Sequence, residues 1–421
     1  MKQIIATVAA IFGLLFLSAQ PTETLTLDGC YILAQENYPL FKQRDLIGKS
    51  KAYNIDNAKM GYLPQVNISA QATYQSDVTK IALPPSVPIT IEPPNKDQYK
   101  LYGEVNQSLT DAFLIEPQRK LALNRAEVEQ QKLEVDLYQL KERVNQLYFG
   151  ILLIDGQEEQ VEILKRDLQS GIDKISAAIK NGVAYKSNLS ELRAELLKAD
   201  QRTIELKATR KAYVDMLGQF INRELTENTK LESPTPVLPS LGLNRPELSF
   251  FDLQKKTLDT QDKLVVAKTL PRAGVFFQGG YANPALNFLK NEFAGYYITG
   301  IRFGWSLGGF YTLRKDKKLL DVNRSLIDIQ RETFLFNTNF ALKQQNAELD
   351  KLNDLIKSDD EIIGLREEVK NAAKAQLENG VITSSDFLTK LNAEDQARQN
   401  RLIHHIQLLM AQYNYKTTSG N

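Results

Sequence analysis

Residues 133–154 read LEVDLYQLKERVNQLYFGILLI. Apolar residues recur here at alternating steps of four and three: Leu133, Leu137, Leu140, Val144, Leu147, Ile151 and Ile154, and the register continues through Val161, Leu168, Ile172, Ile175 and Ile179. This spacing gives a helix one continuous apolar seam, as in a coiled coil. Because no proline interrupts residues 119–181, we expect a helix of roughly 90 to 100 Å at ~1.5 Å per residue. A compact globular domain has no room for such a helix.

A second stretch of the same kind lies in the C-terminal half. Apolar residues recur every seven positions at Leu335, Leu342, Leu349, Ile356 and Ile363, and residues 311–378 contain no proline. Heptads alone are typical of a fibrous coiled coil. The segments between the two long helices argue for a different class of protein.

The composition excludes several function classes. The chain has 421 residues, with 52 Lys and Arg against 51 Asp and Glu, so its net charge of +1 gives no reason to expect a nucleic-acid partner. Cys30 is the single cysteine, and His404 and His405 are adjacent and therefore point to different sides of a helix. We expect no catalytic residue, no cofactor and no metal site.

The N-terminus predicts export. Lys2 precedes an apolar run from Ile4 to Leu17, and Ser18 and Ala19 are small residues suited to cleavage. This pattern is typical of a secretory signal peptide, here residues 1–20. No later segment has the ~20 apolar residues of a membrane-spanning helix. Any contact of the mature chain with lipid must therefore be made by strands.

The first half of the mature chain, residues 21–222, alternates helices and strands. We expect a helix over 26–61 with a break and restart at Pro39, strands over 65–76 and 98–109, a long helix over 114–181 and a returning helix over 187–222. In the first strand Val66, Ile68, Ala70, Ala72 and Tyr74 alternate with polar residues. Such a strand has one apolar face and one polar face.

The second half repeats this order after a proline-containing linker at 223–243. In residues 244–421 we expect a helix over 245–269, strands over 273–282 and 296–307, a long helix over 310–379 and a final helix over 385–416. Both long helices end at Asn-Gly-Val, at 181–183 and 379–381. The chain is therefore predicted to consist of two structural repeats.

The strands predict a membrane barrel that one chain cannot complete. Apolar side chains on one face and polar ones on the other are typical of a barrel with lipid outside and water inside. Four strands cannot close such a barrel, and lipid excludes open sheet edges, so the chain must oligomerise. A soluble hairpin packed on helices is the alternative for either strand pair alone, but two pairs at matching positions favour the membrane. The residues expected in an aromatic girdle at the lipid boundary, with core packing as the alternative for each, are Tyr74, Tyr99, Tyr281, Tyr297 and Trp305.

Several short motifs in this order resemble the TolC-type outer-membrane efflux proteins. They are LTLDGCYILAQENYPL at 25–40, Leu63-Pro64, NRPEL at 244–248, Leu270-Pro271, WSLGG at 305–309, and the paired turns Gly182-Val183 and Gly380-Val381. Each motif is weak alone, but their order and duplication cover the mature chain.

The resemblance implies a homotrimer in the outer membrane of a Gram-negative bacterium. Three chains would share a 12-stranded β-barrel, continued across the periplasm by an α-barrel of long antiparallel helical hairpins. The trimer would be the passive exit duct of a tripartite efflux pump or a type I secretion system. Its partners would be outer-membrane lipid, a periplasmic membrane-fusion adaptor and an inner-membrane RND- or ABC-type transporter.

The resemblance also implies where the duct is gated. The helix tips, Gly182-Val183 and Gly380-Val381, would dock the adaptor. The family's gate acid, six residues after the tip glycine, corresponds to Asp386 in the second half and to Asn188 in the first. Positions that carry polar gating contacts in the family are apolar here, Leu377 and Ile382. A cap of the following helix, helped by Ser384 and Ser385, is an equal reading of Asp386.

Two alternatives remain open at the level of sequence. A secreted or periplasmic coiled-coil scaffold without a pore would also carry the heptads. Within transport, a protein-secretion duct and a duct for drugs or metal ions have the same pattern, because cargo is selected upstream.

Overall fold

The computed structural model describes residues 24–81, 88, 92–238 and 242–421. The expected signal peptide, residues 1–20, lies outside these ranges. The chain divides into two compact units, one formed by 1–42, 133–246 and 334–421 and the other by 43–132 and 247–333. Each unit combines segments of both sequence repeats. The repeat boundaries therefore do not coincide with the compact units, and the two repeats, 21–222 and 244–421, stay a prediction.

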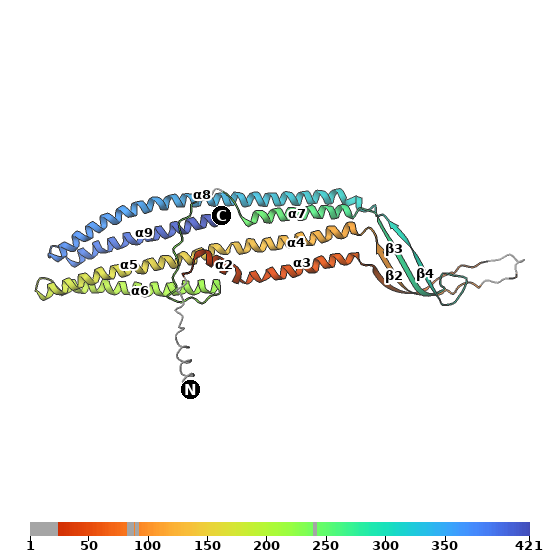
Figure 1. Ribbon diagram of the computed structural model, residues 1–421, viewed down its shortest axis with the longest axis horizontal. Helices are drawn as coiled ribbons and strands as arrows, with labels where there is room; N and C mark the ends of the chain where they lie inside the picture. Colours follow the sequence, from red (N-terminus) through yellow and green to blue (C-terminus); the bar gives the residue numbers. More distant parts are fainter. Residues whose placement is uncertain (1–23, 82–87, 89–91, 239–241) are drawn as a thin grey trace, which may run out of the picture. The chain divides into compact units, whose positions relative to one another are not determined.

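The first unit is helical. Its elements are α2 (Leu27–Asn37), η1 (Pro39–Lys42), the end of α4 (Ala112–Tyr138), α5 (Leu140–Lys180), α6 (Lys186–Ile221), the C-terminal part of α8 (Gly309–Glu378) and α9 (Ser384–Ser419). Helix α5 packs against α2, α6 and α9, and Figure 1 shows the α5–α6 and α8–α9 hairpins. The predicted seam of α5 is buried, with Val144, Ile151, Val161 and Leu168 all at 0% exposure.

Two extended segments, around Leu25 and around Leu231, pack on this core. Together they are called the strap. Leu25 pairs with Leu231 in an isolated parallel bridge. The hydroxyl of Tyr148 donates to the carbonyl oxygens of Leu25 and Glu232, at 2.7 and 2.6 Å. A buried phenol needs such acceptors, so the strap explains why a tyrosine outside the seam is fully buried.

Two predicted helices are divided. The helix expected over 26–61 breaks at Tyr38, which has an extended backbone (φ −65°, ψ 136°) because a residue before proline is disfavoured in a helix; α3 (Gln43–Lys59) and η2 (Met60–Tyr62) follow. The helix expected over 114–181 is α4 and α5, separated at Gln139. The backbone of Gln139 stays helical, but its N–H bond to the Val135 carbonyl is stretched to 3.4 Å.

The second unit contains the sheet. Besides α3, α7 (Pro246–Ala267) and the N-terminal parts of α4 and α8, it holds β1 (Gln65–Tyr74), β2 (Asp97–Ser108), β3 (Arg272–Asn283) and β4 (Ala294–Gly304). The strand order is β1-β2-β3-β4, and every neighbouring pair is antiparallel. Ala70 pairs with Leu101, which pairs with Tyr281. The two hairpins of the two repeats therefore form one sheet.

The last strand is shorter than expected. We predicted a strand over 296–307, but β4 ends at Gly304, and Trp305 lies beyond it. The indole N–H of Trp305 donates to the Thr269 carbonyl at 3.0 Å, a contact outside the ladder. The remaining element ends lie within three residues of those expected. Among the described helices, none is both long and apolar enough to cross a membrane.

Candidate functional site

The two faces of the sheet differ in chemistry and in exposure. One face carries Val66, Ile68, Tyr74, Tyr99, Leu101, Val105, Val275, Phe277, Tyr281, Tyr297, Ile301 and Phe303. All of these side chains are exposed in the single chain, Ile68 at 81% and Ile301 at 78%. An apolar patch of this size in contact with water is rare in a soluble monomer. This face therefore needs an apolar environment that the described residues do not supply.

The opposite face is polar and partly self-paired. Asn106 Nδ2 donates to Glu104 Oε1 at 2.7 Å, and Arg302 Nη1 lies 3.3 Å from the same oxygen. The Arg302 guanidinium also lies over the Phe276 ring, 4.6 Å from its centroid. Such an arrangement suits contact with water.

The predicted aromatic girdle falls at two levels of the sheet. Tyr74, Tyr99 and Tyr281 lie on the apolar face near the loop end, and Tyr297 lies nearer the middle of β4. Phe293, which sequence reasoning missed, stacks on Tyr281 at 5.7 Å between ring centroids. Its signal was available, because Phe293 continues the alternation of Tyr297 past Gly295. Trp305 lies past the other end of β4, against Phe310.

The two helix tips have the same backbone geometry. Gly182 and Gly380 adopt left-handed conformations, with φ of 77° and 69°. The N–H of each following valine donates back into the preceding helix, Val183 to Ala178 at 3.0 Å and Val381 to Gln376 at 2.8 Å. These bonds satisfy carbonyls at the helix end. Val183 and Val381 are exposed at 76% and 70%, so each tip presents an apolar residue to solvent.

Asp386 is the third residue of helix α9 and completes a capping box with Thr383. Its carboxylate accepts hydrogen bonds from the Thr383 hydroxyl at 2.7 Å and the Thr383 N–H at 3.1 Å, and its own N–H donates to Thr383 Oγ1. The N-cap is therefore Thr383, and neither Ser384 nor Ser385 has that role. These bonds hold the pKa of Asp386 below its ordinary value, the hydroxyl contributing most. Asn188 occupies the matching third position of α6, where its N–H donates to the Tyr185 carbonyl at 3.2 Å.

Ion pairs join the helices above the tips. Lys370 of α8 lies between Asp167 of α5 and Glu394 of α9, at 3.2 and 3.5 Å. Glu394 is 3% exposed and also pairs with Arg398. Closer to the tip, Lys174 of α5 pairs with Glu378 of α8 and lowers the Glu378 pKa.

Sequence reasoning missed this network, although a signal was present. Glu394 and Arg398 continue the spacing of Phe387 and Leu391 along α9, so charged residues occupy the seam. Charged residues in a seam require partners, because an isolated buried charge is costly. The partners themselves come from α5 and α8 and were not predictable from local sequence.

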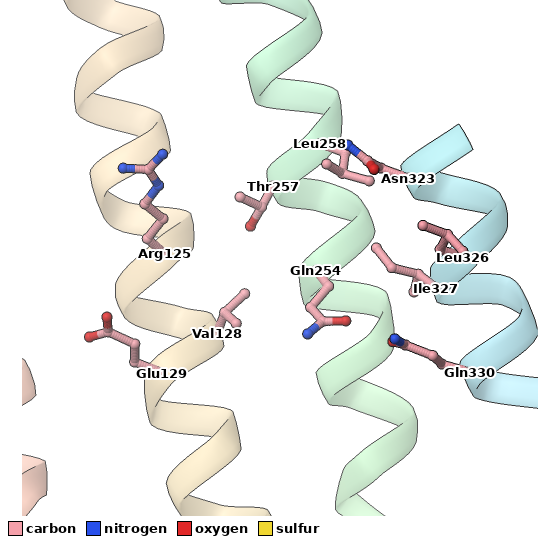
Figure 2. Close-up of a pocket in the computed structure, with 10 residues that line it drawn as sticks. All are labelled: Arg125, Val128, Glu129, Gln254, Thr257, Leu258, Asn323, Leu326, Ile327 and Gln330. Atoms are coloured by element: carbon pink, nitrogen blue, oxygen red, sulfur yellow. The ribbon is translucent and has the colours of Figure 1, made fainter. Parts of the chain in front are cut away.

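A stripe of α8 is exposed within the part of the chain that the structure describes. Apolar residues recur at heptad spacing through Leu319, Val322, Leu326, Ile329, Phe336 and Phe340. Each is more than half exposed, Phe336 at 70%. Figure 2 shows Leu326 and Ile327 beside a groove of about 470 Å³ between α4, α7 and α8, with Val128 directed towards α7. The stripe has the spacing of a coiled-coil seam, and no helix of the described ranges covers it.

Cys30 is inaccessible, and His404 is in contact with a carboxylate. Cys30 is fully buried, and burial raises its pKa to about 12. His404 Nδ1 lies 2.6 Å from the Asp359 carboxylate. Within the described ranges, no three His, Cys, Asp or Glu side chains are grouped to hold a metal ion.

Residues 31–222 match the model of the outer membrane efflux protein family. The resemblance inferred from the sequence motifs is thereby confirmed. No curated protein matches the chain.

Solved outer-membrane channels share the fold. VceC of Vibrio cholerae is 13% identical, with a TM-score of 0.66 over 94% of this chain and 96% of that one. The open-state MtrE channel of Neisseria gonorrhoeae is 12% identical, with a TM-score of 0.66 over 94% and 89%. The CmeC channel of Campylobacter jejuni is 12% identical, with a TM-score of 0.63 over 94% and 85%. The mainly helical fold with four antiparallel strands is therefore that of an outer-membrane channel chain.

Proposed function

We propose that three copies of this chain form a 12-stranded barrel in the outer membrane, continued by a helical tunnel, and that this trimer conducts cargo passively out of the cell. The observation that carries the proposal is the four-stranded sheet with an exposed apolar face. Its edge strands β1 and β4 leave backbone groups unpaired, and lipid excludes such edges. Joining β4 of one copy to β1 of the next removes the edges and turns the apolar face to lipid.

The exposed α8 stripe supports oligomerisation independently of the sheet. A seam from Leu319 to Phe340 spans three heptads, and its side chains are exposed in the single chain. Burying a leucine-sized side chain stabilises an assembly by about 1.5–3 kcal/mol. A helix of the neighbouring copy supplies the missing partner of this seam.

Roles for the site residues follow from this assembly. The tips carrying Gly182, Val183, Gly380 and Val381 dock a periplasmic adaptor, and Asp386 from three copies forms an acidic ring at the entrance, near Asn188. Tyr74, Tyr99 and Tyr281 lie at the level of the lipid headgroups near the loops and Trp305 at the other boundary, whereas Tyr297, also expected in the girdle, faces lipid between these two levels. An inner-membrane RND- or ABC-type transporter loads the duct, which makes and breaks no bond and is not an enzyme.

The acidic ring makes the channel cation-selective. We expect single channels of the purified mature protein in a planar bilayer to prefer K⁺ over Cl⁻, and Asp386→Asn to reduce that preference. The depressed pKa of Asp386 keeps the carboxylate charged down to pH values below its ordinary pKa of 3.8. Selectivity should therefore persist from pH 7 to pH 5 and fall only as the pH drops through the folded-state pKa. The capping bonds of α9 also need the charged carboxylate. Their contribution to the stability of the helix is therefore lost in the same acid range.

The matched control is Asp360→Asn. Asp360 of α8 forms an ion pair with Arg401 and is remote from the tips in sequence. Reversal potentials measured in a KCl gradient decide the result. Channels whose selectivity is identical in wild type and Asp386→Asn contradict the ring. Protein that forms no channel contradicts the proposed function. It favours the alternative explanation of the heptads, a coiled-coil scaffold without a pore.

The tip glycines are expected to matter for docking and not for folding. A Cβ added at Gly182 or Gly380 meets no atom within 4 Å, so only the left-handed backbone opposes substitution, at about 1–2 kcal/mol. Gly182→Leu/Gly380→Leu should therefore still form trimers in the outer membrane but lose cross-linking to the adaptor. Gly364→Leu, an open position within α8, is the control. Full cross-linking by the double variant contradicts the docking assignment.

A further inference from the structure

The polar face of the sheet carries an excess of positive charge. Its positions on the four strands hold three cations, Lys100, Arg272 and Arg302, and one carboxylate, Glu104, which leaves a net charge of +2 per chain. The polar positions of β1 are all neutral. This sign is opposite to that of Asp386 at the helix tips.

The three cations are not equivalent. Arg302 is paired with Glu104 at 3.3 Å, and Arg272 is the first residue of β3, at the helix end of the sheet. Lys100 lies at the loop end of β2, and within the described ranges it has no carboxylate at ion-pair distance. Its Nζ lies between two aromatic rings, 4.8 Å from the Tyr102 centroid and 5.3 Å from the Tyr296 centroid. These rings position the ammonium without neutralising it.

A cavity of about 420 Å³ opens beside this lysine. Lys100, Tyr296 and Gln98 supply polar atoms, and Pro284, Leu286 and Phe288 supply an apolar wall. Gln278 Nε2 donates to the Tyr296 hydroxyl at 3.4 Å and helps to fix that ring. Ala282 of β3, which pairs with Lys100, also lines the cavity. A concave cavity that combines an apolar wall with a few defined polar groups, one of them a cation, is a candidate small-molecule site.

We infer that this cavity binds small organic anions that have an aromatic or other apolar body. The anionic group contacts the Lys100 ammonium, and the apolar body lies against Tyr296 and Phe288. The site rests on the proposed function in one respect, because the polar face lines the duct only in the closed barrel. In that setting three such sites form a belt near the loop end, and anions that enter from the loop side bind there.

Block of the single-channel current by 2-naphthalenesulfonate, added from the loop side, tests the site. We expect Lys100→Gln to raise the half-blocking concentration about tenfold, because hydrogen bonds to a charged group contribute ~1.5–3 kcal/mol and ~1.4 kcal/mol is tenfold. Lys100→Arg should restore most of the block. The matched control is Lys290→Gln, which changes an exposed loop lysine paired with Glu292 at 3.6 Å. Its channels should be blocked at the same concentration as wild type.

The cation 2-naphthyltrimethylammonium has the same apolar body and should block at least tenfold more weakly. Equal block by the anion and the cation, or equal block of wild type and Lys100→Gln, overturns the assignment. Calorimetric titration of the anion into detergent-solubilised protein separates this result from failure of the proposed function. Lysine-dependent binding by protein that never forms channels supports the site and contradicts the duct, whereas channels with lysine-independent binding contradict the site alone.

Discussion

Replacing Ile301 with arginine is expected to abolish assembly of the protein in the outer membrane. Ile301 is 78% exposed on the apolar face of β4, and arginine on the lipid face of a barrel costs ~2–4 kcal/mol at the bilayer midplane. Three copies of the substitution raise the cost for a trimer to about 6–12 kcal/mol. Fractionation of membranes and detection of heat-resistant trimers measure the effect.

Ile298→Arg is the matched control for this experiment. Ile298 lies three residues earlier on the same strand and is partly buried on the polar face, opposite Gln278. Arginine there should face water and leave assembly intact. If both variants assemble as wild type does, the apolar face is not in lipid.

Replacing Glu394 with alanine is expected to be the most destabilising change in the helical unit. It removes a buried carboxylate between Lys370 and Arg398. Breaking a buried ion pair costs ~3–5 kcal/mol, and because both cations keep a second carboxylate we expect about 2–3 kcal/mol. The midpoint for thermal loss of the helical circular-dichroism signal should fall by roughly 5 °C.

Two further variants separate charge from packing at this position. Glu394→Gln keeps the shape and one hydrogen-bond acceptor, so its midpoint should lie between those of wild type and Glu394→Ala. Glu368→Ala removes an exposed carboxylate of α8 and should change stability by less than ~0.5 kcal/mol. A midpoint for Glu394→Ala equal to that of Glu368→Ala contradicts a stabilising role for the network.

The sequence predicted those features that depend on local periodicity. The seam of α4 and α5 is buried from Leu133 to Ile175, except for the half-buried Leu147, because a four-three spacing puts its residues on one side of a helix. The two faces of β1 and β4 follow in the same way from alternation. The tip glycines were identifiable because a left-handed residue after a helix is commonly glycine.

Features that depend on distant segments were not predictable. Tyr148 and Asn145 are fully buried outside the seam because the strap and α9 cover them: Asn145 Nδ2 donates to Asn414 Oδ1 at 2.9 Å. Helix α8 carries two apolar stripes. Local sequence does not indicate that the residues from Leu319 to Phe340 are the ones left exposed. The sequence also left the cap and gate readings of Asp386 equal. The structure shows the cap, and the gate stays a proposal that needs the assembled trimer.

The central claim is that the exposed sheet and the exposed α8 stripe are completed by two further copies of the chain. The most direct test is the mass of the detergent-purified mature protein, determined by light scattering with the detergent contribution subtracted, followed by insertion of the same sample into a planar bilayer. The account predicts a trimer that inserts and conducts. A stable monomer or dimer that remains soluble without detergent and never inserts would contradict it.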